Sequence, residues 1–158
     1  MGKVITTKRR IRIKETGKSR TYRANQGWRT IQGRRIFFRS GWEVNYAWWL
    51  QFLKEKGQIK EWLYEPERFY FDKIKSGTTS YLPDFKVIRN DGTHYWIEVK
   101  GYMDARSATK IKRFRKYFPK EHLEIVDAAR FREIRQLCSF VKDRWEGIGT
   151  EGDKNELD

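Results

Sequence analysis

Apolar side chains recur at helical spacing in the segment "RSGWEVNYAWWLQFLKEKGQ", and this period predicts a helix over residues 41–56. The positions that carry the period are Trp42, Tyr46, Trp49, Leu50 and Leu53. Gly57 follows as a stop signal, because glycine readily adopts the left-handed conformation that ends many helices. We therefore expect one well-defined helix in the first half of the chain.

After this helix the pattern becomes extended. The segment "IKEWLYEPERFYFD" (59–72) predicts two short strands separated by Pro66, and strands over about 80–89 and 93–100 flank the turn "NDG". A helix over 104–117 ends before Pro119, "HLEIVD" predicts one more strand, and "ARFREIRQLCSFVKDRW" predicts a final helix. Residues 1–38 show no sustained period beyond short strands around Val4 to Lys14.

The order α-β-β-β-β-α-β-α predicts an α/β fold in which a mixed central β-sheet is flanked by helices. We divide the chain into a basic N-terminal arm over 1–38 that orders on binding, a core domain over 39–145, and an acidic, flexible tail over 146–158. The order of the strands within the sheet does not follow from this pattern.

Charge is concentrated in the arm. The chain carries a formal net charge of +14, and residues 1–39 contribute 13 Lys or Arg against the single acid Glu15. Such density favours a polyanionic partner, foremost nucleic acid, with a membrane surface as the weaker alternative. No apolar stretch is long enough to span a membrane and no signal-peptide core is present, so we expect a cytoplasmic protein, in the host cell if phage-encoded. Cys138 is the only cysteine, which excludes an internal disulfide.

The hairpin "YLPDFKVIRNDGTHYWIEVKG" (81–101) holds the candidate chemistry. Strand alternation places His94, Trp96, Glu98 and Lys100 on one face, and the turn folds Asp84 back toward Glu98. Two carboxylates repel each other unless a cation lies between them, and oxygen ligands suit Mg²⁺. A metal there would polarise a phosphate and activate a water, with Lys100 orienting or deprotonating that water or stabilising charge, which predicts phosphodiester hydrolysis. The alternative is a structural Glu–Lys pair on an exposed strand.

These residues resemble the PD-(D/E)XK nucleases, whose motif stands here as Pro83-Asp84, thirteen residues, then Glu98-Val99-Lys100. More narrowly, "FRSGWEVNYAWWLQFLKEKG", a strand ending in "YEPE", then "YLPDF" and "WIEVKG" resemble the phage endonuclease I group of Holliday-junction resolvases. The resemblance covers about residues 39–101. It implies a restriction-endonuclease-like core for the nuclease domain.

The resemblance also implies Mg²⁺, with Mn²⁺ as a substitute, held by Asp84, Glu98 and the carbonyl of Val99. Glu43 maps onto a further catalytic acid and Lys100 onto the catalytic lysine. A homodimer is implied, because two symmetry-related sites match the paired nicks that resolve a four-way DNA junction in recombination and repair. Glu43 has a second explanation, since Ser40 and Glu43 form a capping box in which Glu43 has no catalytic role.

Basic residues in the arm and in the helix over 104–117 are candidates for DNA binding, and the helix is alternatively a solvated face. They are Lys8, Arg9, Arg10, Arg12, Arg34, Arg35, Arg39, Lys110, Lys112 and Arg113. His94 and His122 are expected to be structural or surface residues, and Trp42, Trp48, Trp49 and Trp62 to lie in the core or a dimer interface. No glycine-rich phosphate loop is present, so no nucleotide cofactor is expected.

Three functions remain open at this point. The first is a metal-dependent endonuclease selective for branched DNA. The second is a restriction-like, nicking or transposition-associated endonuclease that acts on linear duplex through the same residues. The third is a basic DNA- or RNA-binding protein in which the hairpin acids are structural.

Overall fold

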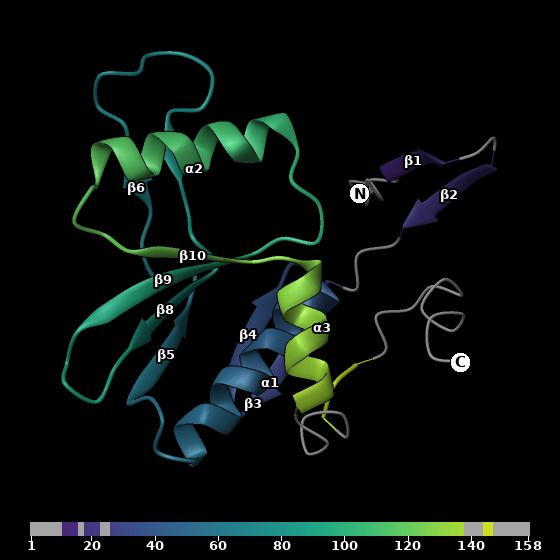
Figure 1. Cartoon of the computed structure of the whole chain (residues 1–158), viewed down its shortest axis with the longest axis vertical. Coiled ribbons are helices and arrows are strands. Elements are labelled where there is room, and N and C mark those ends of the chain that lie inside the picture. Colours follow the sequence, from purple (N-terminus) through teal and green to yellow (C-terminus); the bar gives the residue numbers. More distant parts are fainter. Residues whose placement is uncertain (1–10, 16–17, 23–25, 138–143, 147–158) are drawn as a thin grey trace, which may run out of the picture.

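The computed structural model describes residues 11–15, 18–22, 26–137 and 144–146. Its centre is a four-stranded sheet in the order β10-β9-β8-β5, shown in Figure 1. The strands are β5 (Glu61–Tyr64), β8 (Phe85–Ile88), β9 (His94–Val99) and β10 (Leu123–Val126). Because β9 and β10 are parallel and the other neighbours antiparallel, the sheet is mixed. The predicted mixed α/β class is therefore confirmed.

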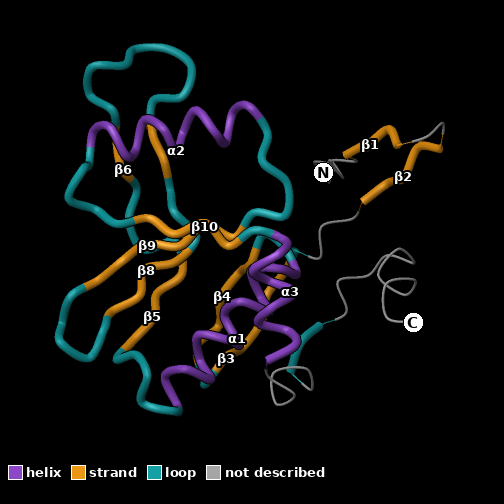
Figure 2. The backbone as a smooth tube through the Cα atoms, in the orientation of Figure 1, coloured by secondary structure: helices purple, strands orange, loops and turns teal. Residues whose placement is uncertain are grey.

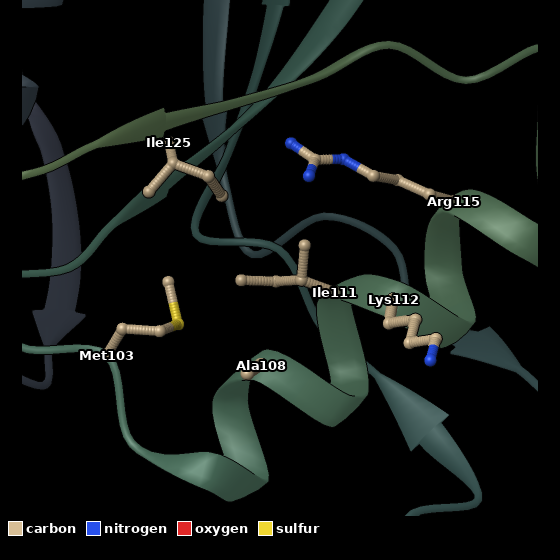
Figure 3. Close-up of a pocket in the computed structure, with 6 residues that line it drawn as sticks. All are labelled: Met103, Ala108, Ile111, Lys112, Arg115 and Ile125. Atoms are coloured by element: carbon tan, nitrogen blue, oxygen red, sulfur yellow. The ribbon is translucent and has the colours of Figure 1, made fainter.

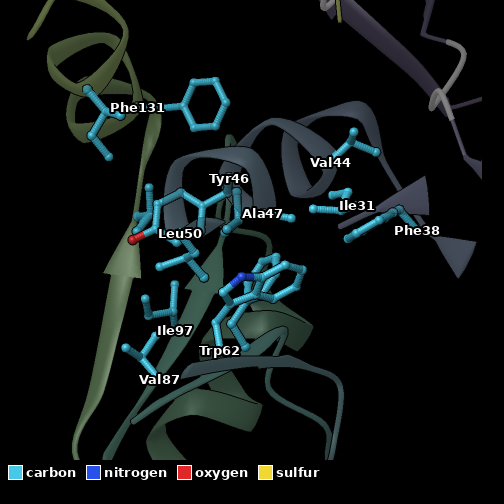
Figure 4. Packing of buried hydrophobic residues seen from close by; sticks show 14 of the residues in the cluster. Ile31, Phe38, Val44, Tyr46, Ala47, Leu50, Trp62, Val87, Ile97 and Phe131 are labelled. Atoms are coloured by element: carbon cyan, nitrogen blue, oxygen red, sulfur yellow. The ribbon is translucent and has the colours of Figure 1, made fainter. Parts of the chain in front are cut away.

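Helices cover both faces of this sheet (Figure 2). Helices α1 (Gly41–Glu55) and α3 (Ala128–Leu137) pack on one face, and α2 (Ala105–Tyr117) packs on the other. The first core, seen in Figure 4, joins Leu50 of α1 to Trp62, Val87 and Ile97 of the sheet. The second joins residues of α2, among them Phe114, to Trp96. No helix in the described part of the chain is long and apolar enough to cross a membrane.

The predicted helices are confirmed where the structure describes them. The side chain of Ser40 accepts from the Glu43 N–H at 3.2 Å and caps α1, and Gly57 has a φ of 70° just beyond its end. The carboxylate of Asp104 accepts from the Ser107 N–H and caps α2 in the same way. Residues 138–143 of the predicted last helix lie outside the described residues, as do residues 1–10 of the arm and 147–158 of the tail.

The prediction of a single strand over 80–89 is wrong, because the strand is interrupted in its middle. Residues 82–84 leave the ladder, because Pro83 has no N–H to donate to a neighbouring strand. The segment before the break, β7 (Ser80–Tyr81), pairs instead with β6 (Phe69–Tyr70) in a separate two-stranded sheet. Five strands therefore stand between α1 and α2 instead of four.

The N-terminal segment contains two antiparallel hairpins. The first joins β1 (Ile11–Glu15) to β2 (Lys18–Tyr22), and the second joins β3 (Gly27–Ile31) to β4 (Arg34–Phe38). Ile31 and Phe38 are fully buried against the core that includes α1. The expectation that the arm extends through residue 38 is therefore wrong for residues 27–38, since they belong to the folded body.

Candidate active site

Asp84 and Glu98 come together at one end of the central sheet. The ladder pairs Phe85 of β8 with Ile97 of β9, so the residues one step further, Asp84 and Glu98, lie opposite each other on the α2 side. The backbone N–H of Val99 donates to Asp84 Oδ2 at 2.8 Å. Both acids are only 9% exposed. The turn thus brings the two carboxylates into one buried position.

The charge of this pair is incompletely compensated. Burial raises the pKa of Asp84 well above its ordinary value, and the negative charges of Glu98 and Glu43 raise it further. Burial also raises the pKa of Glu98, although the Tyr81 hydroxyl and the charge of Lys100 act in the opposite direction. Both ionised carboxylates would be stabilised by a cation between them.

Tyr81 holds one oxygen of Glu98 in place. Its hydroxyl donates to Glu98 Oε2 at 2.6 Å in a buried hydrogen bond, and its ring lies 5.3 Å from that of Phe114 in α2. Burial and the charge of Glu98 raise the pKa of Tyr81, so the hydroxyl stays protonated and remains a donor. The hydrogen bond and the ring packing together fix the orientation of the Glu98 carboxylate.

Lys100 directly follows β9 on the same side of the strand as Glu98. Its Nζ lies 3.7 Å from Asp104 Oδ2 at the start of α2, and its side chain is 28% exposed. Its positive charge lowers the pKa of Glu98, which places the ammonium within electrostatic reach of the acid pair. The structure therefore gathers the predicted aspartate, glutamate and lysine in one region.

Glu43 reaches the same region from the first turn of α1. Its carboxylate accepts from Ser40 Oγ at 3.0 Å, from the Tyr64 hydroxyl at 2.5 Å and from the Arg39 N–H at 3.2 Å. Ser40 thus caps the helix, as one half of the expected capping box, while the Glu43 carboxylate reaches back to the Ser40 hydroxyl and to the Arg39 N–H. The negative charge of Glu43 also raises the pKa of Asp84, so this carboxylate at the start of α1 acts electrostatically on the acid pair.

The packing of Trp42 joins the start of α1 to the end of β9. Its ring stacks on Phe131 of α3 with centroids 4.4 Å apart. A Cβ atom at Gly101 would lie 3.3 Å from the same indole, closer than most such contacts. Glycine after Lys100 therefore allows this close approach, which positions Glu43 relative to the strand.

Glu65 is a fourth acid at this site, and sequence reasoning did not assign it a role. It directly follows β5 with a φ of 43°, and its N–H donates to the Asp84 carbonyl at 2.8 Å. Burial raises the pKa of Glu65 despite its 2.9 Å ion pair with Arg39. Its charge in turn raises the pKa of Asp84. The available signal was the acid between the end of a strand and Pro66 in "YEPE".

A metal ion would have two side-chain ligands here. Among the residues that the structure describes, no three His, Cys, Asp or Glu side chains form a ready-made metal cluster. The candidate set is Asp84 and Glu98 with the main-chain carbonyl of Val99. This set fits Mg²⁺, which keeps several waters and commonly uses one or two carboxylates, and the buried negative charge gives such an ion a favourable position.

The predicted DNA-binding residues of the arm have different surroundings. Lys8, Arg9 and Arg10 lie outside the described residues, and Arg12 lies in β1, whose side chains are not described. Arg34 packs its guanidinium 4.1 Å over the Trp62 ring and donates to the Trp62 carbonyl at 3.0 Å, which makes it part of the core surface. Arg35 and Arg39 are exposed.

On α2, the positive charge of Lys110 makes a small contribution that lowers the pKa of Glu98. Arg113 donates to the Thr78 carbonyl at 2.5 Å and so holds the loop after β6. Lys112 is exposed beside a shallow hollow of about 370 Å³ between α2 and β10 (Figure 3). The residues that line this hollow are Met103, Ala108, Ile111, Lys112, Arg115 and Ile125. Neither Asp84 nor Glu98 is among these lining residues, so the carboxylate pair is not part of the hollow.

Neither histidine joins the acids. His94 lies at the opposite end of β9, where its Nε2 is 2.8 Å from Glu121 Oε2. His122 is exposed and its Nε2 lies 3.3 Å from Glu124 Oε1. Both histidines are surface or structural residues in this fold, as expected.

Residues 20–133 of the 158-residue chain match the family described as "Protein of unknown function (DUF1064)". The chain belongs to this family. The DUF1064 match includes the β3–β4 hairpin and every acid of the site, and it ends within α3. No curated protein and no solved structure matches the chain.

Proposed function

We propose that the chain is a metal-dependent endodeoxyribonuclease that hydrolyses phosphodiester bonds in branched DNA and resolves four-way junctions by paired nicks. The observation that carries the proposal is the buried Asp84–Glu98 pair with raised pKa values beside Lys100. A protein that only binds phosphate gains nothing from uncompensated acids near its polyanion. Branched DNA is proposed as the substrate because "YLPDF" and "WIEVKG" resemble the corresponding segments of junction resolvases.

The proposal includes a restriction-endonuclease-like core and a homodimer. The mixed sheet between α1 and α2, with the acids at one end of β8 and β9, is compatible with such a core. Two copies related by a two-fold axis would present two sites to a symmetric junction, and the paired nicks then follow from symmetry.

Each residue of the site has a task in this reaction. Asp84, Glu98 and the Val99 carbonyl would hold Mg²⁺ or Mn²⁺, which supplies phosphate polarisation and a water of lowered pKa. Lys100 orients the attacking water or stabilises the charge that develops on the phosphate. Tyr81 keeps Glu98 in a fixed orientation, and Glu43 and Glu65 add negative charge that favours cation binding at Asp84.

The test compares a labelled four-way junction with linear duplex of the same arm sequences, in Mg²⁺ and in EDTA. We expect paired cuts near the crossover that require Mg²⁺ and are absent from the linear duplex. Glu98→Gln should abolish them, whereas Glu124→Gln, an exposed acid on the adjacent strand β10, should cut as the natural chain does.

Two outcomes would revise the proposal. Equal cutting of junction and linear duplex would assign a restriction-like or nicking endonuclease that uses the same site. Binding without cutting in every divalent ion would mean that Asp84 and Glu98 are structural and that the chain only binds nucleic acid.

A further inference from the structure

The β3–β4 hairpin has two unlike faces. Ile31 and Phe38 point into the core and are fully buried. The alternate positions of both strands are exposed, and the ladder pairs them across the hairpin, Trp28 with Phe37 and Thr30 with Arg35. We call these four residues the outer face of the hairpin.

Aromatic rings dominate the outer face. Trp28 is 57% exposed and Phe37 is 43% exposed, which is unusual for side chains of this size. Their rings meet edge to face with centroids 5.5 Å apart, and the Arg35 guanidinium lies 4.7 Å from the Trp28 ring centroid. The rings are thus held in place by each other and by a cation while much of their surface stays open.

Charge on the hairpin is entirely positive. Residues 26–39 contain four arginines and no acid. Three of the arginines have carboxylate partners: Arg29 pairs with Glu146, Arg34 with Glu61 and Arg39 with Glu65. Within the part of the chain that the structure describes, Arg35 has no carboxylate partner and its cation lies against Trp28. Its charge is therefore available to an anionic partner.

We propose that the outer face is a stacking platform for unpaired bases of a nucleic-acid strand. Aromatic rings bind bases of any sequence by stacking, and a neighbouring arginine adds cation–π attraction and a phosphate contact. A second copy of this chain fits less well, because a two-fold interface would bring Arg35 against Arg35 with no acid on either face. An apolar peptide would leave the same charge buried without a partner.

The platform lies close to the carboxylate site. Two residues after Phe37, the Arg39 N–H donates to Glu43 Oε2, and the Arg39 guanidinium pairs with Glu65. Two residues of extended chain span about 7 Å. This part of the inference rests on the proposed nuclease function: a junction or fork opened at its branch point would place unpaired bases on the outer face while the adjacent phosphates reach the acids.

The test measures binding alone. Fluorescein-labelled dT20, a fork with single-stranded flaps and a blunt duplex are titrated with protein in EDTA at fixed salt, and anisotropy gives the affinities. We expect the double variant Trp28→Ala, Phe37→Ala to bind dT20 at least about tenfold more weakly than the natural chain, and blunt duplex within about twofold. Tyr70→Ala, which removes a 62% exposed ring from β6, should change neither affinity.

A second variant separates stacking from folding. Trp28→Leu keeps an apolar side chain next to Phe37 but removes the ring, and thermal melting checks that both variants remain folded. We expect Trp28→Leu to lose affinity for dT20 several-fold. Unchanged affinity for dT20 in a folded variant, or equal losses on dT20 and duplex, would overturn the platform. If a variant differed from the natural chain in its sedimentation coefficient but bound dT20 with the same affinity, the outer face would instead be a surface for self-association.

Failure of the platform and failure of the nuclease proposal are distinguishable. If the natural chain cuts junctions while the double variant binds dT20 normally, the platform alone is wrong. If the double variant loses dT20 binding but the natural chain never cuts, the platform stands and the nuclease proposal is wrong.

Discussion

Buried or half-buried carboxylates lie beside both ends of strand β9, and the two ends differ in how the negative charge is compensated. At the first end, Glu121 accepts from Trp96 Nε1 at 2.6 Å and lies 2.8 Å from His94 Nε2. Burial acts to raise the pKa of Glu121, but these partners outweigh it and the pKa is lowered. At the other end, the pKa values of Asp84 and Glu98 are raised.

This difference separates a structural acid from a candidate functional one. A carboxylate whose charge is stabilised by hydrogen-bond donors contributes to the stability of the fold. In a buried pair with raised pKa values the ionised form is destabilised, and such shifted pKa values are concentrated at functional sites. The same strand therefore has a satisfied end and a poorly compensated end. Substitutions that remove charge from one end at a time test whether the two ends have these different roles.

The largest effect is expected at Glu98 and Asp84. Glu98→Gln or Asp84→Asn should lower the rate of junction cleavage by about 1,000-fold or more, because each substitution removes a charged ligand of the proposed metal ion. Glu121→Gln should leave the cleavage rate within about twofold and lower the melting temperature. The measurement is the cleavage rate of each variant under single-turnover conditions. If Glu121→Gln lost as much activity as Glu98→Gln and Asp84→Asn, the two ends of β9 would not differ in function.

A smaller effect is expected from Glu43, where capping and catalysis can be separated. Ser40→Ala removes the cap and should lower the free energy of unfolding by about 0.5 to 2 kcal/mol, with cleavage by the folded enzyme retained. Glu43→Gln keeps much of the hydrogen bonding but removes the charge beside Asp84, and should lower cleavage by about 100-fold. If Glu43→Gln instead lowered only the melting temperature, Glu43 would be a cap and nothing more.

Tyr81→Phe should have a moderate effect with a pH signature. The Tyr81 hydroxyl lowers the pKa of Glu98, so its loss should raise that pKa further and move the acid limb of the pH–rate profile to higher pH. We expect cleavage to fall about tenfold near neutral pH and to recover in part at alkaline pH. Tyr70→Phe, at an exposed tyrosine, is the matched control. A uniform loss at every pH would assign Tyr81 a packing role only.

The smallest effect concerns stability. Because the pKa of Asp84 is higher in the folded chain than in the unfolded chain, the native state holds the proton longer, and stability falls as pH rises from about 4 through the folded-state pKa. Asp84→Asn cannot ionise and can still accept from the Val99 N–H. In EDTA it should melt about 2 to 4 °C above the natural chain at pH 8 and at the same temperature at pH 4. The same difference at both pH values would contradict this explanation.

Much of this fold follows from local patterns. Helix α1 was predictable because the Ser40 cap, the apolar period and Gly57 agree with one another. The succession of strands and helices that follow α1 along the chain was also largely predictable. The "NDG" turn between β8 and β9 was enough to predict that Asp84 lies near Glu98. The order of strands in the sheet was not, because it depends on contacts between distant segments.

The β3–β4 hairpin escaped prediction for a physical reason. Two of its inward-facing positions are Arg29 and Arg34. A hydrophobicity pattern counts both as polar, although in the structure they are half-buried and paired with carboxylates. The apolar alternation is therefore hidden, although Ile31 and Phe38 lie in the core. Charged side chains with long apolar stems can occupy core-facing positions that a hydrophobicity pattern does not count.

Glu65 and Tyr81 were missed because their places depend on loops. Glu65 reaches Asp84 only through a left-handed backbone conformation after β5. Tyr81 reaches Glu98 because the break at Pro83 turns β7 out of the main sheet and under α2. Neither geometry follows from the period of the flanking strands.

A calorimetric titration of Mn²⁺ into metal-free protein without DNA tests directly whether the Glu98 end of β9 is a divalent-metal site. We expect a binding site in the natural chain that is lost in Asp84→Asn and in Glu98→Gln and is retained in Glu121→Gln. Equal Mn²⁺ binding by all four proteins, or none by the natural chain, would contradict it.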